Sequence, residues 1–387
     1  MKKIVFFFLT AALFINCDKK AEIVSTVTVK NNLSMDREFE TVEVDISNLA
    51  DEKVANLVVL DAENKIVTSQ IVDADFDGKN DVILFQPTIK ANQSKKYTIA
   101  VSEVKNKADT VYCFSRFVPE RTDDYTWENN RVAFRTFGPV AQKMIEDGVK
   151  GGTLSSGIDA WLKRVQYPII NKWYKKAEKE KGAYHKDHGE GLDNFHVGVS
   201  RGVGGTAVKV DSSYYFSKNF TSYKTITTGP IRTSFVLNYA TWDANGKQID
   251  ETKHISLDYG QNLSRFEIDI KGTETISTGL TLHKKKGVTN QNDAEFWISH
   301  WETLGDSKIG SGIVTTKSYF SGSEKYVTPK KDESNHFLHL NVVNNKVVFY
   351  SGFGWVKSKQ FNNKKDWENY LTNFSKKISS PLIVTKN

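Results

Sequence analysis

"PIRTSFVLNYATWDANGKQIDETKHISLDYG", residues 230–260, decides the fold. Two long runs rich in β-branched and aromatic residues flank Asn245 and Gly246, and an Asn-Gly pair in that position is a strong signal for a tight β-hairpin. Residues 264–272, "SRFEIDIKG", then alternate apolar and polar side chains as a third half-buried strand would. The pattern predicts an antiparallel meander within a large, super-sandwich-like antiparallel β-sandwich that has a few helices.

Shorter alternating segments, such as "TVEVDIS" at 41–47, fill residues 25–105. Asn, Asp, Lys and Gly separate them, which is typical of a small antiparallel β-sandwich. The polar run "EVKNKADT" at 103–110 connects this part to the rest of the chain. Because 387 residues can build more than one core, we expect a mostly β protein with an N-terminal sandwich at 25–105 and a large sandwich at 106–387.

Two segments have apolar side chains at helical spacing. In residues 363–378 the apolar stripe predicts a helix that packs on the core. In residues 156–182 a similar stripe predicts a helix that Pro168 breaks or kinks. The two stripes consist of Trp367, Tyr370, Leu371 and Phe374, and of Ile158, Trp161, Leu162 and Val165.

The first residues, "MKKIVFFFLTAALFINC", contain two lysines, an apolar run and then Cys17. This pattern predicts a signal peptide over residues 1–16, because the apolar run is too short and too early for a spanning helix. A cysteine directly after such a run indicates lipoprotein processing, with Cys17 acylated and residues 17–24 as a tether. We expect an exported protein that is lipid-anchored to a bacterial membrane, with ordinary secretion as the alternative. Only Cys113 would remain, so no intramolecular disulfide is expected.

The charge balance is mildly basic, with 53 Lys and Arg against 46 Asp and Glu and a formal net charge of +7. On an exported protein such an excess suits an acidic glycan better than nucleic acid. The glycines of "SRGVGG" at 200–205 do not match the dinucleotide-binding fingerprint. The composition therefore favours an anionic oligosaccharide as the partner and no nucleic acid.

Alternate carboxylates occur in "DADFDGKND", residues 73–81. Such carboxylates before a glycine can wrap a hard cation, because the turn brings their oxygens round one point. No Glu stands at the twelfth position that an EF-hand needs, so the pattern predicts a shorter calcium loop, with an Asp-Gly β-turn as the alternative. The sequence requires no other cofactor. The expected ligands of this structural calcium are Asp73, Asp75, Asp77 and Asp81.

Residues 184–205, "YHKDHGEGLDNFHVGVSRGVGG", contain three of the eight histidines and six glycines. Imidazoles, charges and glycines fill a core badly, so we interpret the stretch as a functional loop, with a polar surface loop as the alternative. His185, His188 and His196 are spaced so that a zinc ion is a second alternative. Nearby cations would instead repel a metal and attract a carboxylate or sulfate. These cations are Lys163, Arg164, Lys186 and Arg201.

A second polar stretch, residues 116–139, interleaves arginines with aromatic residues. Aromatic faces stack on sugar rings and guanidinium groups pair with carboxylates and sulfates, so the mixture suits an acidic carbohydrate. A strand with charged edges and a buried tryptophan is the alternative. The residues concerned are Arg116, Arg121, Arg131, Arg135, Tyr125, Trp127 and Phe134.

Four runs, taken in their order, resemble the exported family labelled domain of unknown function 4861, which occurs in bacterial gene clusters that degrade polysaccharides. The resemblance covers nearly all of the chain after the signal peptide. It implies a glycan-processing role and, within that role, the activity of an ulvan oligosaccharide dehydratase, which removes water from a terminal uronic acid. The four runs are residues 116–139, 157–174, 184–205 and 228–243.

Such a dehydration takes the proton at C5, next to the carboxylate, and expels the hydroxyl at C4. A cation must neutralise the carboxylate, a base must reach C5, and an acid must protonate the departing hydroxyl. The run "YHKDH" offers Tyr, His and Lys for these roles. We assign His188 as the base, oriented by Asp187 or Glu190, and Tyr184 as the acid, with His185 as its alternative.

The substrate contacts are assigned from charge and aromatic character. They are Arg201 and Lys163 to the carboxylate, Arg131 or Arg164 to a sulfate or second uronate, Lys186 to the anionic groups, and Trp127 stacked on a sugar ring. Two other functions remain open. One is a polysaccharide lyase that cuts at uronic acids by the same elimination, and the other is a non-catalytic glycan-binding lipoprotein. A glycosidase is less favoured, because no stretch singles out two facing carboxylates.

Overall fold

The computed structural model describes residues 21–75, 77–104, 110–283 and 286–386. The predicted signal peptide and Cys17 lie outside the described residues. Within these ranges the chain is mostly β, with several antiparallel sheets and four α-helices, which confirms the predicted fold class. Over the same residues, no helix combines the length and apolar character that crossing a membrane requires.

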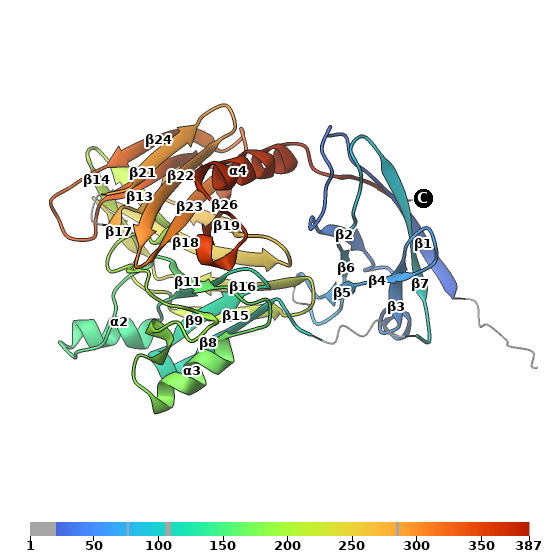
Figure 1. Cartoon of the computed structure of the whole chain (residues 1–387), viewed down its shortest axis with the longest axis horizontal. Coiled ribbons are helices and arrows are strands. Elements are labelled where there is room, and N and C mark those ends of the chain that lie inside the picture. Colours follow the sequence, from blue (N-terminus) through green and yellow to red (C-terminus); the bar gives the residue numbers. More distant parts are fainter. Residues whose placement is uncertain (1–20, 76, 105–109, 284–285, 387) are drawn as a thin grey trace, which may run out of the picture.

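Two antiparallel sheets with a shared apolar core form the first sandwich, at the right of Figure 1. Strand β27 from the C-terminal end pairs with β1, so both ends of the described chain lie in one sheet. The sheet orders are β27-β1-β7-β3-β4 and β2-β6-β5. The bounds are β1 Glu22–Lys30, β2 Val42–Asp45, α1 Asp51–Val54, β3 Leu57–Leu60, β4 Ile66–Val67, β5 Ser69–Val72, β6 Val82–Phe85, β7 Ser94–Val101 and β27 Ile383–Lys386.

Side chains of the first sandwich reach into the rest of the molecule. Gln70 accepts a hydrogen bond from the backbone N–H of Arg232 and donates one to the Arg232 carbonyl oxygen, both at 2.9 Å. Gly229 leaves room for this contact, because a Cβ there would lie 2.4 Å from the Gln70 amide carbon. Arg37, which is fully buried, donates to the carbonyl oxygen of Ser380 at 2.7 Å. These contacts join the first sandwich to the large one.

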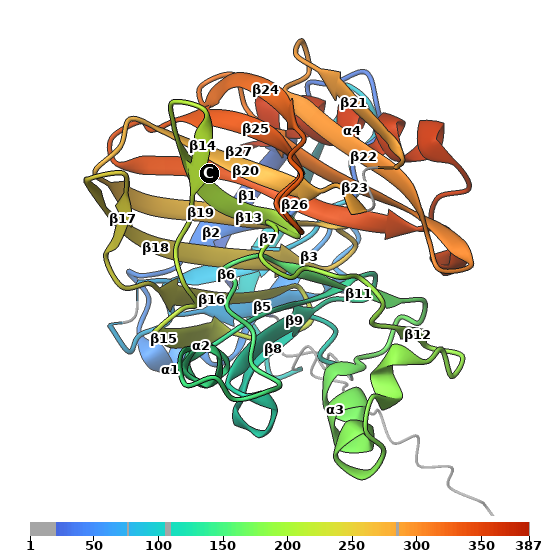
Figure 2. The ribbon, with the colours of Figure 1, turned by 90° about the vertical axis from the view of Figure 1, so that its left-hand side faces the viewer.

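Two facing sheets form the large sandwich (Figures 1 and 2). Their orders are β15-β16-β18-β19-β26-β23-β22-β21, with β17 paired to β18, and β14-β13-β20-β25-β24. The predicted hairpin is confirmed, since Ala244 pairs with Lys247 and the turn residues Asn245 and Gly246 have φ of 56° and 89°.

The strands of the large sandwich occupy most of the second half of the chain. In the nine-stranded sheet they are β15 Ser222–Thr227, β16 Arg232–Asn238, β17 Trp242–Ala244, β18 Lys247–Asp258, β19 Leu263–Lys271, β21 Val288–Asn292, β22 Trp297–Leu304, β23 Ser307–Thr315 and β26 Lys346–Trp355. In the five-stranded sheet they are β13 Val203–Val210, β14 Ser213–Tyr215, β20 Thr275–Thr281, β24 Phe320–Tyr326 and β25 Asn335–Asn341.

A third sheet, β12-β11-β10-β9-β8, packs against the large sandwich. Of the helix predicted over residues 156–182, the part before Pro168 is wrong, because Asp159–Lys163 form strand β11, while the part after Pro168 contains helix α3. Leu162 faces the main core and Trp161 packs in another apolar cluster, so the strand is buried on both faces. A strand buried on both faces has consecutive apolar residues, and that pattern also fits the apolar spacing of a helix. The bounds are β8 Phe114–Val118, β9 Asp124–Glu128, β10 Ala133–Thr136, α2 Pro139–Glu146, β11 Asp159–Lys163, α3 Ile170–Lys179 and β12 Gly191–Leu192.

Helix α4, Lys364–Ser379, confirms the other helix prediction. Asn363 caps its N-terminus by accepting a hydrogen bond from the backbone N–H of Asp366. The fully buried Trp367 donates from its indole nitrogen to the carbonyl oxygen of Ser311 at 3.1 Å. The apolar stripe therefore packs α4 on the nine-stranded sheet, as the spacing predicted.

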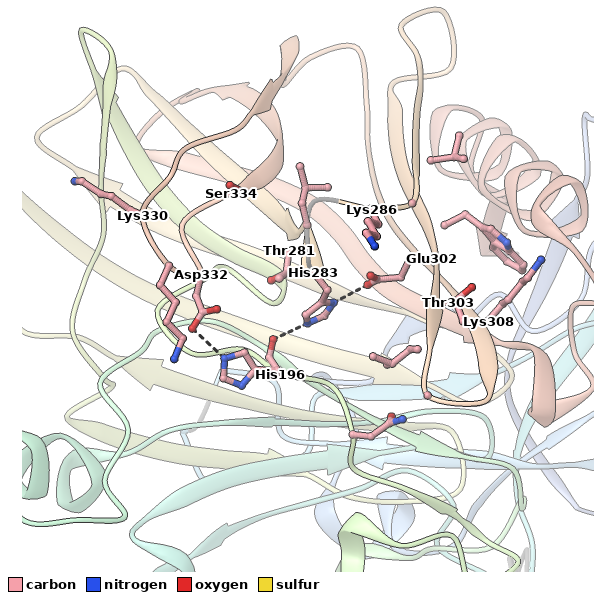
Figure 3. Close-up of a pocket in the computed structure, with 18 of the residues that line it drawn as sticks. His196, Thr281, His283, Lys286, Glu302, Thr303, Lys308, Lys330, Asp332 and Ser334 are labelled. Carbon is pink, nitrogen blue, oxygen red and sulfur yellow. Dashed lines mark hydrogen bonds and ion pairs between the residues drawn. The ribbon is translucent and has the colours of Figure 1, made fainter.

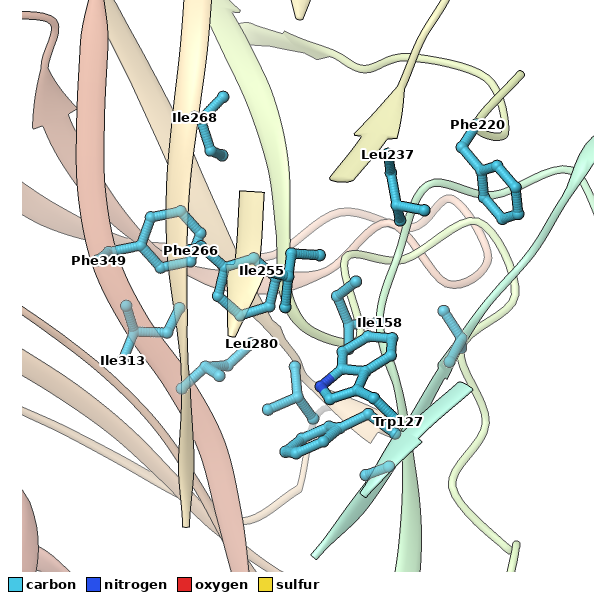
Figure 4. Close-up of a cluster of buried hydrophobic side chains, with 14 of the residues drawn as sticks. Trp127, Ile158, Phe220, Leu237, Ile255, Phe266, Ile268, Leu280, Ile313 and Phe349 are labelled. Atoms are coloured by element: carbon cyan, nitrogen blue, oxygen red, sulfur yellow. The ribbon is translucent and has the colours of Figure 1, made fainter. Parts of the chain in front are cut away.

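The main core fills the space between the two sheets of the large sandwich and extends to the third sheet (Figure 4). Burial of this much apolar surface supplies the main driving force for folding. The side chains labelled in Figure 4 are Trp127, Ile158, Phe220, Leu237, Ile255, Phe266, Ile268, Leu280, Ile313 and Phe349.

Candidate functional site

A cleft of about 1250 Å³ opens at the ends of strands from both sheets of the large sandwich (Figure 3). Its walls are the loop after β12, the turn from β20 to β21, the end of β22 with the turn to β23, and the loop from β24 to β25. The polar side chains that line it are Asn194, His196, Thr281, His283, Lys286, Glu302, Thr303, Lys308, Lys330, Lys331, Asp332 and Ser334.

At one wall of the cleft, His196 is paired with Asp332. The distance between His196 Nε2 and Asp332 Oδ2 is 2.9 Å, and the imidazole is 61% exposed. Gly198 permits this approach, because a Cβ there would lie 2.3 Å from Asp332 Oδ2. Among the described residues, no group hydrogen-bonds the second ring nitrogen of His196, Nδ1. An imidazole oriented by a carboxylate, with its other nitrogen free, is suited to act as a general base.

His283 lies between His196 and Glu302. Its Nδ1 is 2.6 Å from Glu302 Oε1, and its Nε2 is 2.7 Å from the backbone carbonyl oxygen of His196. Both partners can only accept, so both ring nitrogens must donate, as they do in an imidazolium. Burial favours the neutral form, but Glu302 and the His196 carbonyl outweigh it and raise the pKa of His283. The two acceptors and the raised pKa both favour the cationic form of His283, which also holds the backbone of His196.

A third imidazole, that of His300, lies beside Glu302 and differs from His283 in its charge state. Its Nε2 is 3.3 Å from the carbonyl oxygen of Lys286, and its Nδ1 is 3.8 Å from Glu302 Oε1, too far for a hydrogen bond. Burial lowers the pKa of His300, although the charge of Glu302 acts the other way. Gly287 gives the ring its space, since a Cβ there would lie 2.6 Å from His300 Nε2. At neutral pH His300 is therefore uncharged.

The lysines of the cleft make it cationic. In the described part of the chain only Lys330 has an acidic partner among them, Glu333 at 3.5 Å. The two carboxylates that line the cleft, Glu302 and Asp332, are both paired with histidines. An anionic ligand would therefore meet ammonium groups that are not neutralised by the protein. The four lysines are Lys286, Lys308, Lys330 and Lys331.

None of the residues predicted for catalysis, Tyr184, His185, His188 and Arg201, lines the cleft. Tyr184, Lys186 and His188 line a separate hollow of about 350 Å³ against helix α3, which we call the α3 hollow. Tyr184 is buried and its hydroxyl accepts a hydrogen bond from Arg121 at 3.3 Å, while His185 Nδ1 contacts the carbonyl oxygen of Asp193 at 2.7 Å. The stretch 184–205 thus runs from the α3 hollow to the cleft.

The acids expected to orient His188 have other partners. Asp187 Oδ1 pairs with Arg164 at 3.1 Å. Glu190 accepts hydrogen bonds from Lys172, the Tyr167 hydroxyl and the Trp173 indole nitrogen. The exposed His188 has no hydrogen-bond partner among the described residues, so its ring is not oriented as a general base would be.

The two cations predicted to hold the substrate carboxylate are buried and engaged. Lys163 donates to Glu128 at 2.7 Å and to two backbone carbonyls, and Glu128 also accepts from the N-terminal amides of α3. Arg201 donates to Ser156 and to two carbonyls, and its guanidinium lies 3.9 Å from the centroid of the Phe216 ring. Both side chains hold the fold together in this structure.

Trp127, Arg131 and Arg164 also make structural contacts. The fully buried indole of Trp127 donates to Ser264 at 2.9 Å, so it offers no face to a sugar ring. Arg131 lies over the Phe39 ring of the first sandwich, 5.4 Å from its centroid. Arg164 donates to the carbonyl oxygen of Gly189 and is one-third exposed. For residues 116–139 the alternative interpretation was a strand with charged edges and a buried tryptophan. The position of Trp127 agrees with that alternative.

Three of the four predicted calcium ligands come together. Carboxylate oxygens of Asp73, Asp75 and Asp81 lie within 4.8 Å of one another, whereas Asp77 accepts from the backbone N–H of Lys79. Calcium binding stays a prediction. Across the described ranges, this is the only group of three or more such residues that could share an ion, so the three histidines proposed as zinc ligands are not gathered round one point.

The sequence profile of the family described as domain of unknown function (DUF4861) matches residues 29–384. The chain belongs to this family. It is also 56% identical to uncharacterized protein P7 of Formosa agariphila over 393 aligned residues, which cover 100% of both chains.

A solved structure shares the fold. A protein in glycosyl hydrolase family 38 from Enterococcus faecalis matches with a TM-score of 0.52 and 10% identity, over 94% of this chain and 47% of that chain. An alpha-mannosidase from Enterococcus faecalis V583 matches with a TM-score of 0.46 and 9% identity, over 94% and 46%. The chain spans about half the length of these structures. At such identities the first match indicates a common fold.

Sequence reasoning missed His283, Glu302 and Asp332, which lie near His196 in space but far from it in sequence. His196 itself was named only as a possible zinc ligand. No local motif surrounds any of the three, because each stands singly at the end of a strand or in a loop. The one usable signal was their residue type, since His, Asp and Glu are the usual acid-base groups.

Proposed function

We propose that the protein binds an acidic oligosaccharide in the cleft and removes water from its terminal uronic acid. The observation that carries this proposal is the oriented His196–Asp332 pair in a cleft with four lysines and the cationic His283. The fold shared with a protein in glycosyl hydrolase family 38 agrees with a carbohydrate substrate. So does the resemblance, seen in the sequence, to a family that occurs in gene clusters that degrade polysaccharides.

In the proposed reaction the cleft lysines neutralise the substrate carboxylate, which makes the C5 proton more acidic. His196 Nδ1 takes that proton while Asp332 stabilises the imidazolium that forms. The electrons of the C5–H bond form the C4–C5 double bond, and the C4–O bond breaks. A cleft ammonium group donates a proton to the departing hydroxyl, which leaves as water. The elimination is not a redox reaction, so it needs no oxidant, reductant or other co-reactant.

His283 is a positioning residue in this scheme. Its Nε2–H holds the carbonyl oxygen of His196, and its charge adds to the field that attracts the uronate. Glu302 keeps His283 protonated and is therefore not free to act as a nucleophile or acid. Because both carboxylates of the cleft are paired in this way, the site is less suited to glycoside hydrolysis, which needs two carboxyl groups facing the scissile bond.

A polysaccharide lyase is the second candidate. It would use the same base and the same carboxylate binding, but the glycosidic oxygen at C4 would leave in place of a hydroxyl. The lysine-rich, open cleft favours neither reaction over the other, and the family resemblance favours the dehydratase. We further propose that the protein is exported and anchored through a lipid on Cys17, because of the apolar run before this cysteine.

Product analysis tests the function. The purified protein from residue 18 onward is incubated with uronic-acid oligosaccharides from ulvan, and ultraviolet absorbance and mass spectra are recorded. A dehydratase gives new absorbance and a product of unchanged chain length that is lighter by one water. Two shorter fragments would identify a lyase, and an unchanged substrate would overturn both proposals in favour of a glycan-binding role.

A further inference from the structure

The α3 hollow has its own walls and its own charge. Helix α3 supplies Lys172, Trp173 and Lys176, and residues 183–191 with Tyr167 supply the opposite side. The hollow has a volume of about 350 Å³, which is enough for a single sugar ring and its substituents.

Cations are in excess in the α3 hollow. Its single acid, Glu190, is paired with Lys172 at 2.5 Å, and the charge of that lysine is thereby neutralised. Lys176 has no acidic partner within 4 Å in the described part of the chain. Lys186 reaches Glu180 at 3.5 Å but is 69% exposed, so solvent screens that pair. A ligand with a carboxylate or sulfate would meet Lys176 and Lys186 together.

The hollow also offers an aromatic face. Tyr167 is 46% exposed, and its hydroxyl is fixed by a hydrogen bond to Glu190 at 2.5 Å. The ammonium group of Lys172 lies 5.7 Å from the centroid of the Tyr167 ring. An exposed, oriented ring beside ammonium groups is suited to stack on the apolar face of a sugar that carries a negative charge.

Protein contacts connect the α3 hollow to the cleft. Arg164 donates to the carbonyl oxygen of Gly189 in the hollow, and it interacts electrostatically with Asp306 in the turn after β22. The adjacent Gly305 lines the cleft and approaches Asn194, where a Cβ would lie 3.0 Å from the side-chain nitrogen. The segment from Gly189 to His196 therefore runs from the α3 hollow to the cleft, where Figure 3 shows His196.

We infer that the α3 hollow is a distal subsite, which binds an internal acidic sugar of the same oligosaccharide whose terminal uronate lies in the cleft. This inference rests on the proposed function and adds to it the preference for longer chains. Substrates that fill both places gain the contacts to Lys176, Lys186 and Tyr167, whereas a disaccharide in the cleft gains none of them. The subsite contributes affinity and takes no part in the bond changes.

Titration calorimetry with ulvan-derived disaccharides and octasaccharides tests the subsite. The variant is Lys176→Ala/Lys186→Ala, and the matched control is Lys95→Ala/Lys365→Ala, which removes the same charge from exposed lysines of β7 and α4. Two lost charge-assisted contacts should weaken octasaccharide binding about tenfold or more and leave disaccharide binding unchanged. Tyr167→Ala should weaken octasaccharide binding while all charges stay in place.

The outcomes separate this inference from the proposed function. An octasaccharide affinity equal to that of wild type in the double variant overturns the distal subsite, and so does an equal loss for disaccharide and octasaccharide. A loss of the same size in the Lys95→Ala/Lys365→Ala control would show non-specific attraction and would overturn it as well. The proposed function fails independently, through the absence of dehydrated product from wild type at any chain length.

Discussion

His283 donates a hydrogen bond from Nε2 to the backbone carbonyl oxygen of His196, at 2.7 Å. The same ring donates from Nδ1 to Glu302, so one imidazolium ties a strand of the large sandwich to the loop that carries the candidate base. Loss of either bond would free the loop or leave a buried charge without a partner. The position of His196, the candidate base, therefore depends on His283 and Glu302, although neither is proposed to react with the substrate.

Replacing His196 tests the catalytic assignment. His196→Ala should lower kcat about a hundredfold or more, because a positioned proton-transfer group contributes on this scale. His188→Ala, the variant that removes the base assigned from sequence, should lower kcat little, since that ring has no orienting partner. Steady-state rates of double-bond absorbance measure both. If His196→Ala kept full activity and His188→Ala lost it, the assignment of His196 as the base would be wrong and the reaction would take place in the α3 hollow.

The pKa of His283 predicts a pH-dependent stability. The pKa of His283 is higher in the folded state than its value of about 6.5 in the unfolded state. The stability that the His283–Glu302 pair contributes is therefore fully present below about pH 6.5, and it is lost as the pH rises through the folded-state pKa. Glu302→Gln should cost about 3 kcal/mol at pH 6, and the difference from wild type should shrink at higher pH. Chemical denaturation at several pH values measures this. A difference that does not change with pH would contradict the charge assignment.

Lys163 should prove structural. Lys163→Met leaves Glu128 buried without its cation, and breaking such a pair costs about 3–5 kcal/mol. We expect a lower midpoint of denaturation and an unchanged substrate KM at temperatures where the variant stays folded. The double change Lys163→Met/Glu128→Gln should recover part of the stability. A raised KM with wild-type stability would restore Lys163 to the role of carboxylate ligand.

The membrane anchor is tested at Cys17. Cys17→Ser removes the thiol that the proposed lipoprotein processing would acylate, so the protein should leave the membrane fraction on cell fractionation. Its enzymatic activity should stay unchanged, since the acyl chains form no part of the core. Cys113→Ser serves as the control, because the buried Cys113 offers no accessible thiol to a lipid. Membrane partition of Cys17→Ser equal to that of wild type would exclude the anchor.

Part of the candidate site could be found from sequence. Asn194 and His196 of the stretch 184–205 line the cleft, whereas His188, to which the base was assigned from sequence, lies in the α3 hollow. Residue type and crowding identify a functional loop, and they do not say which of its side chains faces which hollow. That depends on partners such as Asp332, which comes from another part of the chain.

By itself, the sequence determined the β class, the hairpin at Asn245 and Gly246 and helix α4, because hydrophobic periodicity and turn chemistry act between near neighbours. The order of four sequence runs also indicated the family. Only the tertiary structure decided that residues 159–163 form a strand, since burial on both faces gives an apolar pattern that helices share. It also decided that Lys163 is buried and that His196 meets His283. Such contacts join segments far apart in sequence, and packing of the sheets, which no local pattern encodes, brings them together.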